Sequence, residues 1–121
     1  MSETGNLNYS WSRRIVSQLY SFGVKTVCIC PGSRNTPLTL AFLEHDQYNC
    51  VSHVDERSGA FFALGVALKT QKPVAILSTS GTAIANFLPA VIEASQSRVP
   101  LVIITADRPP HLIGTGANQT I

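Results

Sequence analysis

The amino-acid sequence predicts an α/β fold, in which a parallel sheet is flanked by helices on both faces to give three α/β/α layers. Short apolar segments rich in β-branched residues alternate along the chain with segments of helical periodicity. The first apolar segment, residues 24–30, is an almost continuous run, which is typical of a strand covered on both faces. Strands and helices that alternate in this way form right-handed βαβ units, and we therefore expect a parallel sheet.

The first helix is expected at residues 9–22, after a polar stretch (residues 1–8) that we expect to lie outside it. Trp11, Ile15 and Leu19 recur at the spacing of one helical face and define its expected buried side. Ser10 is the expected N-cap, and Gly23 provides the signal for the end of the helix.

Three further helices are expected between the strands. They lie at residues 36–43, where Pro37 occupies the first turn, at 58–69, which is rich in small residues, and at 83–97. Ile84, Leu88 and Val91 define the expected buried face of the last one. The other three strands are expected at residues 50–54, 73–78 and 100–105, and residues 111–121 are expected to be an irregular connection.

The length of 121 residues fits one domain. Doubly wound domains usually carry about five or six strands, and only four are evident here. Charged residues make up 13% of the chain, about half of the 25% or so that is typical of globular proteins. We therefore expect residues 1–121 to form an incomplete N-terminal domain whose surface is covered by further chain or by a partner.

Composition excludes several classes of protein. The net charge of +2 and the lack of a Lys/Arg cluster argue against nucleic-acid binding. There is no apolar run of the roughly 20 residues that a membrane span needs, and the N-terminus does not resemble a signal peptide. A cytoplasmic protein is expected. Cys28 and Cys30 are expected to be separate core thiols on opposite faces of their strand.

The polar residues that could carry chemistry follow the four predicted strands, at residues 31–35, 55–58, 79–82 and 107–108. The carboxyl ends of parallel strands meet at one edge of a sheet, where ligands of this fold class bind. Hydroxyls, arginines, a carboxylate and helix N-termini therefore converge there. Such a set predicts a site for an anionic ligand.

Each feature alone also has a purely structural explanation. Gly32 and Gly81 suit turns, while Ser80 and Thr82 suit a helix cap. Glu56, at a strand-to-helix junction, serves equally well to balance a helix dipole or to exchange a proton with a ligand. No dinucleotide, Walker or nucleophile-elbow motif occurs, and the acidic residues and histidines do not have the spacing of metal ligands. A non-catalytic anion-binding module thus remains an alternative.

Four segments in this order resemble the thiamine-diphosphate enzymes, over residues from about 9 to 121. They are Pro-Gly-Ser-Arg at 31–34, Asp-Glu-Arg-Ser at 55–58, Thr-Ser-Gly-Thr-Ala at 79–83 and Thr-Ala-Asp-Arg-Pro-Pro at 105–110. The acetolactate synthase and pyruvate decarboxylase groups usually have Ser-Gly-Pro-Gly where this chain has Ser-Gly-Thr-Ala. The chain is more similar to the menaquinone-pathway branch of the family, and those two groups are the alternative within it.

The resemblance implies a role for each loop. Glu56 would be the catalytic residue, with its carboxyl on the ring nitrogen of the aminopyrimidine of thiamine diphosphate. Further cofactor contacts would come from Pro31, Ser80, Gly81, Thr82 and Gln119. The substrate isochorismate would be bound by Ser33, Arg34, Arg108, Asn118 and Gln119. The implied reaction removes CO2 from 2-oxoglutarate and adds the remaining succinyl-semialdehyde unit to isochorismate.

The resemblance also implies that this chain is a pyrimidine-binding domain and that other parts of the enzyme are needed. In the family, Mg2+ (or Mn2+) and the diphosphate are held by a further domain with a Gly-Asp-Gly motif, which does not occur in these 121 residues. We therefore expect no metal ligand in this chain, and no activity from it alone. A homodimer or homotetramer with cofactor sites shared between subunits is expected.

Overall fold

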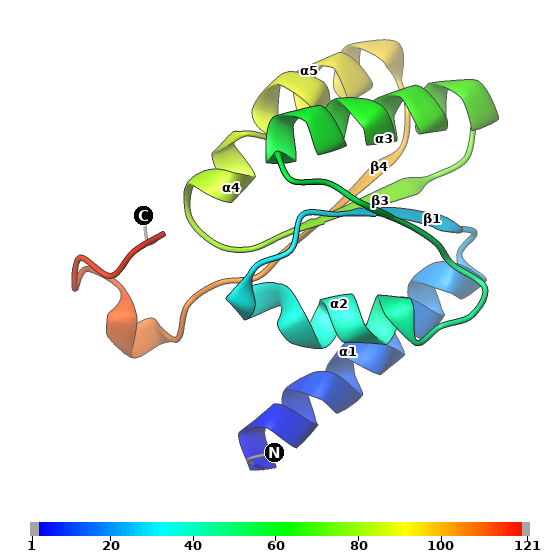
Figure 1. The fold of residues 1–121 in the computed structure, drawn as a ribbon. Coiled ribbons are helices and arrows are strands. Elements are labelled where there is room, and N and C mark those ends of the chain that lie inside the picture. Colours follow the sequence, from blue (N-terminus) through cyan, green and yellow to red (C-terminus); the bar gives the residue numbers. More distant parts are fainter. Residues whose placement is uncertain (1–2, 120–121) are drawn as a thin grey trace.

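A computed structural model describes residues 3–119, which form a parallel four-stranded sheet with helices on both faces (Figure 1). The strands are β1 (Thr26–Ile29), β2 (Asn49–Ser52), β3 (Val74–Ser78) and β4 (Leu101–Thr105), in the order β2-β1-β3-β4. The helices are α1 (Glu3–Ser21), α2 (Thr36–Leu43), α3 (Glu56–Thr70), α4 (Thr82–Ala85) and α5 (Leu88–Ser97), with short 3-10 turns η1 (Ser33–Asn35) and η2 (Pro110–Leu112). The predicted fold class is confirmed.

The sheet separates two hydrophobic clusters. Successive side chains of a strand point to opposite faces. Val27 and Ile29 therefore pack towards α1 and α2, and Cys28 packs towards α3 and α5. Cys30 belongs to the same cluster as Cys28. The expectation that these two cysteines lie on opposite faces is wrong, because residues two positions apart in a strand share a face. The described cysteines are all free thiols.

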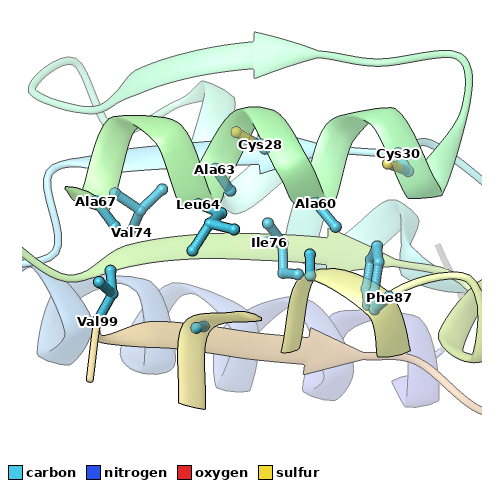
Figure 2. Packing of buried hydrophobic residues seen from close by; sticks show 12 residues of the cluster. Cys28, Cys30, Ala60, Ala63, Leu64, Ala67, Val74, Ile76, Phe87 and Val99 are labelled. Atoms are coloured by element: carbon cyan, nitrogen blue, oxygen red, sulfur yellow. The ribbon is translucent and has the colours of Figure 1, made fainter. Parts of the chain in front are cut away.

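The α3 helix lies close to the sheet because its inner face carries only small side chains over most of its length. Ala60, Ala63 and Ala67 are fully buried against β3, where they meet Val74 and Ile76 (Figure 2). The alanine-rich stretch thus has the close packing that its composition predicts. This packing fixes the position of the N-terminus of α3 relative to the strands.

The α1 helix is longer than predicted and buries a different face. It begins at Glu3, so Ser10 lies inside the helix and is not its N-cap. Trp11 and Ile15 are 54% and 43% exposed, whereas Val16 is buried in the cluster beneath the sheet. Two adjacent faces of this helix have apolar residues at helical spacing, and the spacing alone does not say which one meets the sheet.

The helix predicted at residues 83–97 is two helices, α4 and α5, with a break at Asn86 and Phe87. Pro89 explains the break. In a continuous helix its ring would clash with the carbonyl of Ala85, so it is tolerated only in the first turn of a new helix. The break turns Phe87 inward (1% exposed) and leaves Leu88 58% exposed. Ile84 is 38% exposed as well, so the predicted buried face is wrong for Ile84 and Leu88, whereas Val91 packs against the core as predicted.

Candidate functional site

The strand order places a topological switch point between the carboxyl ends of β1 and β3. From β1 the chain passes to α2 on one face of the sheet, and from β3 it passes to α4 and α5 on the other face (Figure 1). The two loops therefore diverge at this point, which is where open α/β sheets bind ligands. All four predicted polar segments lie at this edge, since each follows a strand of a parallel sheet.

The loop after β1 is held from within by Asn35, whose side chain is completely buried. The amide N–H of Gly32 donates to Asn35 Oδ1 at 2.9 Å, and Asn35 Nδ2 donates to the carbonyl oxygen of Cys30 at 2.9 Å. Pro31, Ser33 and Arg34, which the sequence predicts to bind ligands, are exposed on this loop. Sequence reasoning missed Asn35, for which the only available signal was its place immediately before the helix that begins at Thr36.

The loops after β1 and β3 touch at Gly32. A Cβ atom on Gly32 would lie 2.6 Å from the Cβ of Thr79, which is far inside van der Waals contact. Gly32 has φ −160°, an extended conformation that any residue adopts. Glycine is therefore required here by the lack of space and not by backbone conformation.

The loop after β3 buries hydroxyl groups that have no partner among the residues the structure describes. The side-chain oxygens of Thr79 and Ser80 are in this situation, and the two residues are 3% and 0% exposed. A buried polar group without a hydrogen bond costs about 1–3 kcal/mol, so native proteins retain such groups for a reason. Two such oxygens lie in adjacent residues of the loop after β3.

Gly81 brings the end of the described chain to the loop after β3. Its φ of +71° lies in the left-handed region that favours glycine. A Cβ at this position would also lie 2.5 Å from the carbonyl oxygen of Gln119. Gln119, predicted as a cofactor and substrate contact, thus packs beside the predicted contacts Ser80, Gly81 and Thr82, with Asn118 next to it. Thr82, Asn118 and Gln119 are exposed at this edge.

Glu56 is the first residue of α3, two positions before the predicted start of the helix, and it is half-buried. The N-cap is Asp55, whose carboxylate accepts a hydrogen bond from the Ser58 amide at 2.8 Å. This bond holds the pKa of Asp55 below its usual value. Burial, helped by the negative charges of Glu56 and Asp55, raises the pKa of the Cys30 thiol to about 11. The Glu56 carboxylate therefore acts on the end of β1 as well as on its own helix.

The loop after β4 carries the second predicted arginine. The Arg108 amide donates to the Asp107 carboxylate at 2.7 Å, so Asp107 shapes this loop. Arg108 Nε is buried without a hydrogen-bond partner among residues 3–119. Asp107 and Arg34 line one pocket of about 350 Å³ together with Trp11 of α1. The structure thus places Arg34 in one pocket with Asp107, the residue that precedes Arg108 in the chain.

Within the described part of the chain, no group of three or more His, Cys, Asp or Glu residues could hold a metal ion. No helix among these residues is long and apolar enough to cross a membrane.

These features define a parallel α/β domain that carries a carboxylate and polar loops at the carboxyl edge of its sheet. Residues 10–121 match the family described as thiamine pyrophosphate enzyme, N-terminal TPP binding domain, and the chain belongs to this family. Thiamine pyrophosphate is another name for thiamine diphosphate. The resemblance noted in the sequence is therefore confirmed.

Individual relatives are similar over the whole chain. The identity is 59% over 116 residues to a protein of Halobacterium salinarum, 57% over 116 residues to one of Crocosphaera subtropica, and 53% over 121 residues to one of Dechloromonas aromatica. All three are named 2-succinyl-5-enolpyruvyl-6-hydroxy-3-cyclohexene-1-carboxylate synthase. The matches cover 96–100% of this chain but only 20–22% of each relative, so the chain spans about a fifth of their length.

Proposed function

We propose that this chain is the pyrimidine-binding domain of a thiamine-diphosphate enzyme that decarboxylates 2-oxoglutarate and transfers the succinyl-semialdehyde unit to isochorismate in menaquinone biosynthesis. The family match supports the cofactor, and the name shared by relatives of 53–60% identity supports the reaction. The observation that carries the proposal is that Glu56 and the buried hydroxyls of Thr79 and Ser80, which lack partners, all follow strand ends at one edge of the parallel sheet. The activity belongs to the full-length protein, of which this chain corresponds to one part.

The residues of the loops after β1 and β3 fit the aminopyrimidine ring of the cofactor. Such a ring presents hydrogen-bond donors and acceptors at its edge, and a hydroxyl can act as either. Binding there would satisfy the buried oxygens of Thr79 and Ser80. Pro31, Gly81 and Gln119 border the same two loops. When bound, thiamine diphosphate supplies stabilisation of the negative charge that remains on carbon when CO2 leaves.

The role of Glu56 in this proposal is to hold a proton in a hydrogen bond with a ring nitrogen of the aminopyrimidine. The residue is half-buried and its backbone is held in the first turn of α3. The neighbouring Cys30 thiol remains neutral near pH 7, because its pKa is raised to about 11. Cys30 is therefore not a thiolate that could take up the proton in place of Glu56.

Ser33, Arg34, Arg108 and Asn118 are proposed to bind isochorismate, with Gln119 shared between substrate and cofactor. Isochorismate carries two carboxylates, and a guanidinium group pairs with a carboxylate through two parallel hydrogen bonds. Arg108 Nε is a buried donor without a partner among the described residues, which suits such a role. No lysine occurs in the loops that follow the strands.

The remaining parts of the active site are proposed to lie outside these 121 residues. Mg2+ (or Mn2+) and the diphosphate would be held by a further domain, and the site would be shared between subunits of a homodimer or homotetramer. The absence of a Gly-Asp-Gly sequence from the chain supports this division. The low share of charged residues, 13%, agrees with a domain whose faces are covered by other parts of an assembly.

The proposal is tested by Glu56→Gln in the full-length protein. Glutamine keeps the size of the side chain but cannot hold the proton, so we expect 2-oxoglutarate decarboxylation to fall by about 10²–10⁴-fold. Thermal unfolding should be unchanged. Glu93→Gln, an exposed position on α5, is the matched control and should leave turnover unaltered. Turnover near the wild-type rate in Glu56→Gln would contradict the catalytic role.

A further inference from the structure

We infer that Asn35 is a positioning residue of this site, which acts by holding the loop of Pro31, Ser33 and Arg34 in the geometry that binds substrate. The inference rests on the proposed function for the identity of that substrate. The rigidity of the loop is a property of this chain alone and is tested separately below.

The hydrogen bonds of Asn35 tie the loop to the sheet. Cys30, which follows β1, donates its backbone amide to the carbonyl of Leu77 in β3 at 2.8 Å. Its own carbonyl accepts from Asn35 Nδ2, and the next available amide, that of Gly32, donates to Asn35 Oδ1. Pro31 between them has no N–H to offer. One side chain thus replaces the ladder of backbone bonds that ends with the strand.

Because Asn35 is buried, its hydrogen bonds strongly favour one conformation of the loop. Asn35 is 0% exposed, although asparagine is usually found at the surface. Buried amides without partners are costly, so the loop conformation that satisfies both ends of Asn35 is strongly preferred. The hydroxyl of Thr36 adds a bond to the carbonyl of Ser33 at 3.0 Å, which closes the turn on its other side.

The loop that Asn35 holds also packs against the loop after β3. Gly32, whose amide Asn35 binds, is the residue in contact with Thr79 of the opposite loop. A shift of Gly32 therefore moves either the exposed residues Ser33 and Arg34 or the loop of Thr79. Asn35 is itself fully buried and does not reach a ligand, so any effect on substrate passes through these neighbours.

The experiment uses the full-length protein with three substitutions. Asn35→Ala removes both hydrogen bonds, and Asn35→Asp keeps the acceptor for Gly32 but sets an oxygen against the Cys30 carbonyl. Tyr48→Phe is the control, since it removes a buried hydrogen bond of 2.9 Å to the Val16 carbonyl, on the amino-terminal side of β2. All three are compared by thermal unfolding, amide hydrogen exchange and steady-state kinetics.

We expect Asn35→Ala to accelerate exchange of the Gly32 amide, with Asn35→Asp in between and Tyr48→Phe without effect there. We also expect the KM for isochorismate to rise by about tenfold or more in Asn35→Ala, with less than about a twofold change for 2-oxoglutarate. If Asn35→Ala does not fold, Asn35→Asp carries both measurements.

Two results would overturn the inference. One is a Gly32 amide that exchanges no faster in the Asn35 variants than in Tyr48→Phe, whatever the activity. The other is faster exchange with an equal change of KM for both substrates, as a general loss of structure would give. A wild-type protein that does not use isochorismate would instead refute the proposed function, while the exchange data still decide whether Asn35 holds the loop.

Discussion

At the scale of single residues, the site is marked by a contrast between two kinds of buried polar group. Asn35 has partners at both ends of its side chain, and the loop around it is fixed. The hydroxyls of Thr79 and Ser80, on the loop after β3, have no hydrogen-bond partner among the described residues. A satisfied buried amide specifies one conformation, whereas an unsatisfied buried hydroxyl needs an explanation beyond the fold itself. The loop after β1 is therefore fixed by its own hydrogen bonds, whereas the loop after β3 keeps hydroxyls without partners.

The contact between these loops predicts opposite effects for two glycine-to-alanine substitutions. Gly32→Ala places a methyl group 2.6 Å from the Thr79 Cβ and should lower the free energy of unfolding by about 1–3 kcal/mol. Gly65→Ala, on the exposed side of α3 with nothing within 4 Å, should raise it by about 0.5–1 kcal/mol. Urea unfolding measures both. Equal effects of the two substitutions would show that the loops have room to separate.

The sequence was sufficient to place Glu56, Ser80 and Gly81 at one edge of the sheet, because that follows from strand order and chain direction alone. It placed Asn35 and Thr79 there as well, but it did not show what these two residues contact. Their importance comes from which loop touches which, and Gly32 and Thr79 belong to loops far apart in the chain. Those contacts depend on the β1–β3 pairing, which no local pattern encodes.

At the scale of elements, α4 and α5 show how one proline changes the face that a segment buries. The apolar residues from Ile84 to Ile92 suit a continuous helix by spacing, and the sequence therefore predicts one. Pro89 forces a new helix to begin, and the break rotates Phe87 into the core. Sequence patterns predicted that this segment is helical. Which of its residues face the core was decided by the clash that Pro89 would make with the Ala85 carbonyl in a continuous helix.

This rotation predicts a clear difference between neighbouring positions. Phe87→Ala should lower the free energy of unfolding by about 3–5 kcal/mol, because the ring fills the space between α3, α5 and the sheet. Leu88→Ala removes a side chain that is 58% exposed and should change it by less than about 0.5 kcal/mol. Chemical unfolding of the two variants checks this order. A larger loss for Leu88→Ala would favour the continuous helix.

At the scale of the whole molecule, the fold gathers the polar loops at one edge of the sheet. The strand order puts a topological switch point between β1 and β3, and hydroxyls, a carboxylate and arginines follow the strands at this edge of the sheet. Large apolar side chains remain exposed on the outer faces of the helices, such as Trp11 on α1 and Leu88 on α5. Exposed apolar surfaces of this kind are typical of interfaces with further chain or with partners.

The division of the site predicts how the 121-residue chain responds to the cofactor. Binding to the folded state adds about 2.7 kcal/mol of stability at a ligand concentration of 100 Kd, so a bound cofactor raises the unfolding temperature. The chain offers contacts for the aminopyrimidine, but the described residues include no cluster of metal ligands to hold Mg2+ beside the diphosphate. We therefore expect thiamine diphosphate with Mg2+ to stabilise the full-length protein clearly and the 121-residue chain hardly at all.

Thiamine without its diphosphate provides the matched comparison in the same thermal unfolding experiment. For the 121-residue chain, the two compounds should give the same small shift, since both carry the aminopyrimidine and the diphosphate finds no partner. For the full-length protein, the diphosphate form should give much the larger shift, and only with Mg2+ present. A Mg2+-dependent shift in the 121-residue chain would show that these residues hold the diphosphate themselves, and the proposed division of the site between domains would then be wrong.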